Sequence, residues 1–201
     1  VAKEDRTNWD IAFYTQAFSA GILTNGAAGM DGVALYTYPN ADTNGWNSID
    51  TTGMSTWTAL YNSPEEWEDG AFNRNALGHP DYGWGTYNMV THDVTGDSIY
   101  LVKLADGSLK KFWIVRKNSV NNTYFFRFAN IDNSDEVNVE LDCNSYTDKN
   151  FIYYSLADQK VVDREPTKDS WDILFTKYMS LQSIGVYYPV TGVLNNVNVA
   201  A

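Results

Sequence analysis

One stretch decides the fold class: Ile99-Tyr100-Leu101-Val102-Lys103-Leu104-Ala105-Asp106-Gly107-Ser108-Leu109-Lys110-Lys111-Phe112-Trp113-Ile114. It holds two runs of apolar, β-branched and aromatic residues around the pair Asp106-Gly107. An Asp-Gly pair between such runs is the strongest short-range signal of a β-hairpin. Further runs of this kind occupy residues 9–14, 33–38, 121–129, 137–141, 151–156, 160–162, 171–178 and 190–199. Short strands at this spacing predict an all-β antiparallel fold. Because no linker rich in Pro or Ser interrupts them, we expect a single domain over residues 1–201.

The remaining segments predict loops and very little helix. Ser63-Pro64-Glu65-Glu66 has an N-cap residue, a first-turn Pro and acidic residues, so a short helix is expected within residues 57–69. Residues 21–32 are rich in Gly, Ala and Asn and predict a loop. Residues 40–45 resemble the start of a calcium loop, but position twelve is Thr51 where a bidentate Glu is required, which favours a simple turn.

Composition and charge exclude several functions. The net charge of −11 argues against a nucleic-acid partner, since such proteins carry a basic stripe. No apolar stretch is long enough for a transmembrane helix. The single cysteine, Cys143, allows no internal disulfide and has no accompanying catalytic motif. Val1 is not an initiator residue, so we expect that upstream residues, a secretory leader among them, were removed or not included.

A second feature is an internal repeat. Trp9-Asp10-Ile11-Ala12-Phe13 recurs as Trp171-Asp172-Ile173-Leu174-Phe175, and similar residues flank both copies. Two copies do not make a solenoid. We interpret them as two edges of one architecture.

Together, three segments resemble the signature of the HmuY family, secreted or lipid-anchored haem-binding proteins of Bacteroidetes. They are an aromatic strand, a Val-Val strand and the Trp-Asp-Ile unit: Phe151-Ile152-Tyr153-Tyr154-Ser155-Leu156, Lys160-Val161-Val162 and Trp171-Asp172-Ile173-Leu174-Phe175. Residues 9–13, Gly32-Val33 and the hairpin at 100–114 match other parts of the pattern, so the resemblance is spread over most of the chain. It implies an all-β domain that grips haem between long loops. It also implies an extracellular or outer-membrane, lipid-anchored location, with haem or another flat hydrophobic ligand and an outer-membrane receptor as partners.

The resemblance also suggests where haem would be held. The best-known family members use two histidines, and relatives use methionines; the first histidine directly follows the Trp-Asp-x-Ala-x unit, where this chain has Tyr14. Tyr, His and Met can all ligate haem iron. The candidate iron ligands are therefore Tyr14 and His92, and Met30, Met89 and His79 are further candidates for the haem site. Each also has a structural interpretation: a packed phenol, loop histidines, or methionines that fill gaps in the core.

Catalysis is not indicated. His92-Asp93 has the order of a base and an orienting acid, but neither a Gly-x-Ser-x-Gly elbow nor an activated nucleophile accompanies it. Two non-catalytic alternatives to haem capture stay open. One is a structural or adhesive module that keeps the fold without haem. The other is a carbohydrate-binding module that uses a row of exposed rings from Trp46, Trp57, Trp67 and Trp84.

Overall fold

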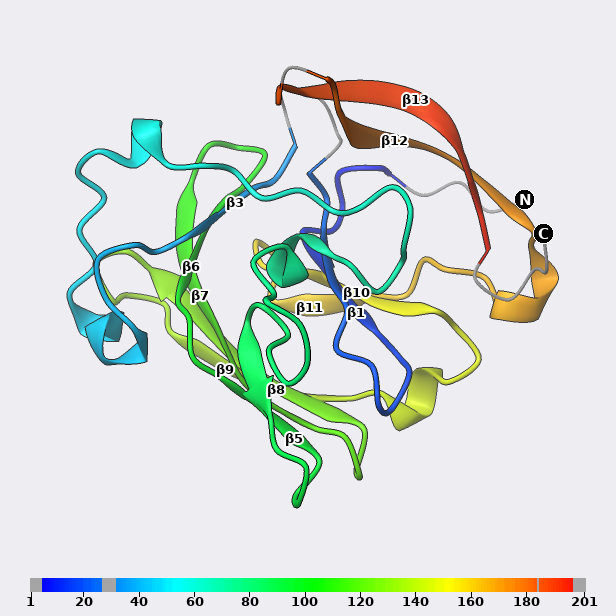
Figure 1. Ribbon diagram of the computed structural model, residues 1–201, viewed down its shortest axis with the longest axis horizontal. Coiled ribbons are helices and arrows are strands. Elements are labelled where there is room, and N and C mark those ends of the chain that lie inside the picture. The colour runs from blue at the N-terminus through cyan, green and yellow to red at the C-terminus, as the bar shows by residue number, and fades with distance from the viewer. Residues whose placement is uncertain (1–4, 27–31, 184, 197–201) are drawn as a thin grey trace.

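A computed structural model describes residues 5–26, 32–183 and 185–196 (Figure 1). The fold is all-β with antiparallel sheets, as the sequence predicted. Apart from the strands, its regular elements are short 3-10 turns: η2 (Thr43–Asn47), η3 (Met54–Thr56), η4 (Ala71–Asn73), η5 (Asn144–Tyr146) and η6 (Lys168–Ser170).

The first sheet contains four strands in the order β11-β10-β1-β2. Their bounds are β1 (Ile11–Tyr14), β2 (Ile22–Thr24), β10 (Phe151–Ser155) and β11 (Lys160–Val162). The strand β1 therefore lies between a hairpin partner, β2, and a strand from far along the chain, β10. Asp10 fixes this junction, because its carboxylate accepts a hydrogen bond from the Leu156 backbone N–H at 2.7 Å.

The second sheet contains seven strands. Five follow the order β3-β6-β7-β5-β4, and β8 and β9 continue it from β7. Their bounds are β3 (Ala34–Thr37), β4 (Gly85–Tyr87), β5 (Asp93–Gly96), β6 (Tyr100–Lys103), β7 (Leu109–Asn118), β8 (Thr123–Asn130) and β9 (Val137–Asp142). The Asp106-Gly107 turn joins β6 and β7 as predicted, and Gly107 has a φ of 86°, which glycine adopts without strain.

The core lies between these two sheets and is dominated by aromatic rings. Phe13 of β1 stacks on Phe126 of β8 with centroids 4.9 Å apart, and Tyr154 of β10 meets Phe126 edge-on at 5.2 Å. Pairs of this kind contribute about 0.5–1.5 kcal/mol each beyond the burial of their area. The aromatic content of the sequence is thus explained largely by packing.

The last two strands form a separate two-stranded sheet. β12 (Ile173–Leu181) and β13 (Tyr187–Asn195) pair only with each other within the described chain. Figure 1 shows this hairpin arching over one side of the molecule, away from the tip of the β4–β5 hairpin. The two copies of the repeat therefore lie in different sheets, because β1 belongs to the four-stranded sheet and β12 to the isolated hairpin.

The predicted helix within residues 57–69 is not formed. The Ser63 hydroxyl does accept a hydrogen bond from the Glu65 N–H at 3.1 Å, but the cap is not followed by helical turns. The side chain of Asn62 explains this, because it accepts from the N–H of Thr24 at 2.9 Å and donates to the carbonyl oxygen of Thr24 at 2.7 Å. This segment is therefore attached to the edge of β2 as an extended loop. By contrast, residues 42–47 form the expected turn, with the Asp42 carboxylate accepting from the Asn44 N–H at 2.9 Å.

Candidate functional site

The β4–β5 hairpin carries two of the candidate haem-site residues, Met89 and His92. Asn88 shapes its turn: the side-chain oxygen accepts from the N–H of Val90 at 2.8 Å and of Thr91 at 3.1 Å. The N–H of His92 donates to the Asn88 carbonyl oxygen at 2.8 Å. His92 has a φ of 60°, a conformation uncommon for residues other than glycine and often found at functional sites. The turn leaves Met89 73% exposed and Val90 87% exposed.

Tyr87 connects the two histidines of the chain. Its hydroxyl lies 2.6 Å from Nδ1 of His92, and its ring centroid is 6.0 Å from that imidazole. The ring centroid of His79 lies 5.5 Å from that of Tyr87. A hydrogen bond at one imidazole nitrogen fixes the tautomer and the ring orientation, which prepares the other nitrogen for a metal. When Nδ1–H of His92 donates to Tyr87, the lone pair of His92 lies on Nε2.

A second loop, residues 15–20, completes this surface. Phe18 is 66% exposed, and its ring meets the His92 imidazole edge-on at 6.0 Å. The loop is held from beneath by Lys117, a fully buried side chain whose Nζ donates to the carbonyl oxygens of Gln16, at 2.6 Å, and Ser19. Burial lowers the pKa of Lys117 to about 8. We call the five residues Phe18, Tyr87, Met89, Val90 and His92 the hairpin-tip surface.

One ion pair lies next to this surface. Nη1 of Arg116 is 3.3 Å from a carboxylate oxygen of Asp93, the residue that follows His92. The guanidinium also lies over the Phe125 ring, 4.6 Å from its centroid. The Arg116 side chain is 40% exposed, so a cation is available beside an otherwise apolar and aromatic surface.

Tyr14 does not join the hairpin-tip surface. Its side chain is 6% exposed and packs in a cluster with Phe151, whose ring centroid is 5.0 Å away. Burial, followed by the charges of Glu68 and Glu165, raises the pKa of the phenol, which disfavours the phenolate that would bind iron. No contact within the described chain links Tyr14 with His92. Met30, the remaining candidate, lies outside the described residues.

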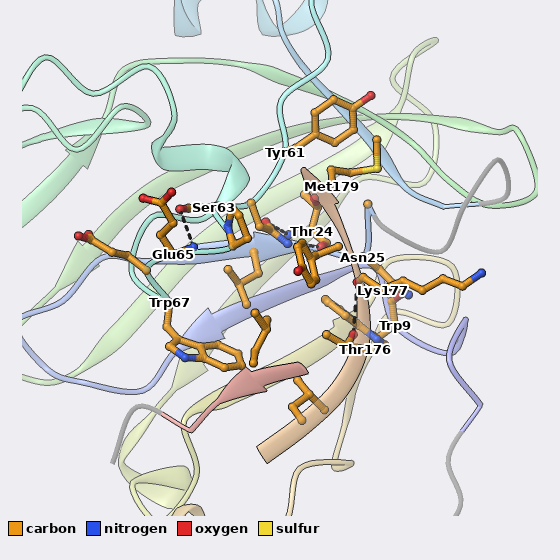
Figure 2. A pocket seen from close by; sticks show the side chains of 18 of the residues that line it. Trp9, Thr24, Asn25, Tyr61, Ser63, Glu65, Trp67, Thr176, Lys177 and Met179 are labelled. Atoms are coloured by element: carbon orange, nitrogen blue, oxygen red, sulfur yellow. Dashed lines mark hydrogen bonds between the residues drawn. The ribbon is translucent and has the colours of Figure 1, made fainter. Parts of the chain in front are cut away.

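A different feature that sequence reasoning missed is a pair of adjoining cavities beneath the β12–β13 hairpin. Their volumes are about 110 and 270 Å³, and both are lined by Trp9, Trp67 and Tyr153. Figure 2 shows the smaller cavity, with the side chains of Trp9, Tyr61 and Trp67 around it. Arg6 and Arg164 line the larger one. Neither cavity is lined by Tyr14, His79, Met89 or His92.

Sequence reasoning also missed three members of the hairpin-tip surface: Phe18, Tyr87 and Val90. The available local signal for Tyr87 was the short β-prone run Gly85-Thr86-Tyr87. Phe18 lies in a segment without periodicity. Its approach to His92 depends on the buried Lys117, which is 101 residues from Gln16 and 98 residues from Ser19 in the chain.

Comparisons with known proteins give no family for this chain. No protein-family model matches it, and no curated protein or solved structure is detectably similar. Within the described residues, no cluster of three or more His, Cys, Asp or Glu side chains is arranged to hold a metal ion. The described part also contains no helix long and apolar enough to cross a membrane.

Proposed function

We propose that this protein is a non-catalytic ligand-binding protein that captures haem at the hairpin-tip surface, in the manner suggested by its resemblance to the HmuY family. The observation that carries the proposal is the contact between Tyr87 and Nδ1 of His92, beside the exposed side chains of Phe18, Met89 and Val90. An exposed apolar group around an oriented imidazole is unusual on a soluble surface and typical of a recognition site.

The chemistry of these side chains fits haem. Imidazole and thioether are both established haem-iron ligands, and both project from the same turn, on His92 and Met89. His92 would hold the iron through Nε2, while Tyr87 keeps the imidazole oriented through Nδ1. Phe18, Met89 and Val90 would cover one face of the porphyrin and exclude water from it. When bound, haem supplies the iron to which these ligands attach and a flat apolar surface.

Arg116 offers a place for the acidic part of such a ligand. Haem carries two propionates, and a guanidinium is suited to carboxylates because of its planar donor geometry. Arg116 already pairs with Asp93 at 3.3 Å, so its head group is oriented beside the hairpin. The proposal includes the location and partner that the resemblance implies: an extracellular or outer-membrane surface, and a receptor to which haem is passed.

The test is a haemin titration of the purified protein, followed by the Soret band. We expect a shifted band and saturation for the natural chain. Replacing His92 with Ala should weaken binding by at least about tenfold, the scale of losing a metal ligand or its support. His79→Ala is the matched control, because this second histidine also touches Tyr87 but makes no hydrogen bond to it. A natural chain that gives no Soret shift, or a His92→Ala variant that binds as the natural chain does, would contradict the proposal.

A second candidate function is a structural or adhesive module without haem. It is favoured by the hairpin β12–β13, which forms a separate two-stranded sheet and leaves Phe175 75% exposed. The carbohydrate-binding alternative is weakened, because its row of exposed tryptophans is not formed: Trp46 and Trp84 are buried in the core, and Trp57 and Trp67 are half-buried. A chain that is silent in the haemin titration and still assembles would support the structural module.

A further inference from the structure

The internal repeat is a repeat of structure as well as of sequence. In the first copy, β1 pairs with β2 so that Ile11 is opposite Thr24 and Phe13 is opposite Ile22. In the second, β12 pairs with β13 so that Ile173 is opposite Asn195 and Phe175 is opposite Val193. In both hairpins the Ile after the Trp-Asp pair therefore lies opposite the residue that precedes an Asn: Thr24 before Asn25, and Asn195 before Asn196.

The hydrogen bonds around the two motifs are also the same. The backbone N–H of Asn25 donates to the Asp10 carbonyl oxygen at 3.0 Å, and its side-chain amide donates to Trp9 and Arg6. The backbone N–H of Asn196 donates to the Asp172 carbonyl oxygen at 2.8 Å, and its side-chain amide donates to Trp171 and Lys168. In both copies the third acceptor is the residue three positions before the Trp.

The surroundings of the two hairpins differ. The first is complete: β10 pairs with the outer edge of β1, the Asp10 carboxylate accepts the Leu156 N–H, and Ile11, Phe13 and Ile22 are fully buried. In the second, Asp172 is exposed and accepts no side-chain hydrogen bond within the described chain. Phe175, the counterpart of Phe13, is 75% exposed, and Ile173 and Val193 are also exposed. Within the described residues, the face of the second hairpin that corresponds to the buried face of the first is thus exposed to solvent, and no strand pairs with the outer edge of β12.

The open edge belongs to β12. The N–H of Gln182 donates to the Val186 carbonyl oxygen, so even-numbered residues of β12 bond to β13 and odd-numbered ones direct their backbone groups outward. Within the described chain, Ile173 and Phe175 thereby offer unpaired N–H and C=O groups, whereas the Lys177 carbonyl oxygen accepts from the Thr176 hydroxyl at 3.3 Å. The opposite edge, on β13, is blunted by Pro189, which has no N–H, and by the Trp67 indole, which donates to the Asn195 carbonyl oxygen at 2.9 Å.

We propose that hairpin β12–β13 is the first hairpin of another unit of this fold, and that the outer edge of β12 accepts an antiparallel strand of the β10 type from that unit. The first copy defines the partner. It is an aromatic strand with a sequence like Phe-Ile-Tyr-Tyr-Ser. The residue after this strand donates its backbone N–H to the Asp172 carboxylate, as the Leu156 N–H donates to the Asp10 carboxylate. The β10 strand of a folded second copy is not available for this, because β1 and β11 already flank it. This inference does not depend on haem binding.

The test uses the full chain and a fluorescent synthetic peptide with the sequence of residues 149–160, which contains β10 and the following turn. We expect saturable binding by fluorescence anisotropy, and none for a scrambled peptide. Phe175→Pro removes one outward N–H and should weaken binding at least about tenfold, since strand addition depends on main-chain hydrogen bonds. Asp172→Ala should weaken it several-fold, while Asp169→Ala, an exposed acid before the strand, should leave it unchanged.

Three results would overturn the proposal. The first is a peptide that does not bind to the natural chain. The second is binding that is equally strong in Phe175→Pro and Asp172→Ala, which would place the peptide at β1 instead of β12. The third is self-association of the natural chain in sedimentation that Phe175→Pro abolishes, which would make a second β12 the occupant of the edge. Circular dichroism and thermal unfolding of both variants should match those of the natural chain, because both residues are exposed.

Discussion

The side-chain amide of Asn196 donates a hydrogen bond to the carbonyl oxygen of Trp171 at 2.7 Å, in the same relation that Asn25 has to Trp9 at 2.9 Å. Each asparagine closes its hairpin against the loop that precedes the Trp-Asp pair. Asn196 has a further role, because its side-chain oxygen accepts from the Asn150 amide at 3.0 Å and so ties β12–β13 to the residue before β10. The two asparagines therefore make the same local hydrogen bonds, but the hairpins that they close contribute differently to the stability of the whole fold.

The first prediction concerns this difference. Asn25→Ala should lower the free energy of unfolding by about 1–3 kcal/mol, because it leaves buried carbonyl groups without a donor in a hairpin that belongs to the core. Asn196→Ala should mainly release the isolated hairpin. Urea denaturation measures the first effect, and limited proteolysis within residues 173–195 measures the second. Equal losses of global stability in the two variants would contradict this account.

The second prediction concerns pH and Glu165. This buried carboxylate accepts hydrogen bonds from the N–H groups of Asn150 and Phe151, but burial outweighs them and raises its pKa above the ordinary 4.5. The folded chain then binds the proton more tightly than the unfolded chain does. The stability that this group contributes is therefore full below pH 4.5 and is lost as the pH rises through the raised pKa.

Glu165→Gln isolates this contribution. The difference in unfolding free energy between the natural chain and the variant should decrease as the pH rises from about 4 to about 7. Urea titrations at several pH values give that difference, and other carboxyls cancel because both chains share them. A difference that increases over this range would mean that the folded state lowers the pKa instead.

The third prediction concerns Lys117. Its folded-state pKa of about 8 is below the ordinary 10.5, so the unfolded chain binds more protons between these values. The contribution of Lys117 to stability should therefore rise with pH over this interval, so the unfolding free energy of the natural chain should increase relative to that of Lys117→Met. The variant should also weaken haemin binding, because Lys117 holds the loop that presents Phe18 to His92. An unchanged pH dependence in the variant would show that Lys117 is not the titrating group.

The fourth prediction compares two tyrosines. Tyr87→Phe removes the hydroxyl that lies 2.6 Å from Nδ1 of His92 and should weaken haemin binding by about 10- to 100-fold, as for other supports of a metal-ligating histidine. Tyr14→Phe is the matched change at the position that the family resemblance favours. It should leave the Soret titration unchanged, since Tyr14 is packed against Phe151. The opposite ranking of the two variants would restore Tyr14 as the ligand.

Local sequence signals were sufficient where a strand or turn depends on its own residues. Asp106-Gly107 fixes the β6–β7 hairpin, and alternation in residues 121–129 identifies β8. Local signals failed where contacts between distant parts of the chain determine the local structure. The strand Ile22–Thr24 lies in a glycine-rich run and is extended because β1 and Asn62 pair with it. Ser63 is an adequate helix cap, but attachment of Asn62 to Thr24 prevents the helix.

The same distinction applies to the candidate site: some of its residues were identified from the sequence, and others depend on contacts between distant parts of the chain. The family resemblance suggested His79, Met89 and His92 as candidates, and the structure places Met89 and His92 in one turn. The sequence could not show that Tyr87 would contact both histidines, or that Phe18, in a loop held by the buried Lys117, would reach His92. It also paired Tyr14 with His92, although the burial of Tyr14 follows from the β1–β10 pairing of residues far apart in the chain.

The proposal that haem binds at the hairpin-tip surface can be tested by NMR. Paramagnetic ferric haem broadens the NMR signals of nearby amides, so a ¹H–¹⁵N correlation spectrum of the labelled chain, recorded as haemin is added, locates the ligand. We predict selective broadening of residues 88–93 and of the loop around Phe18, and its loss in His92→Ala. Broadening confined to Trp67, Trp171 and their neighbours in the cavities, or no broadening at all, would contradict the claim.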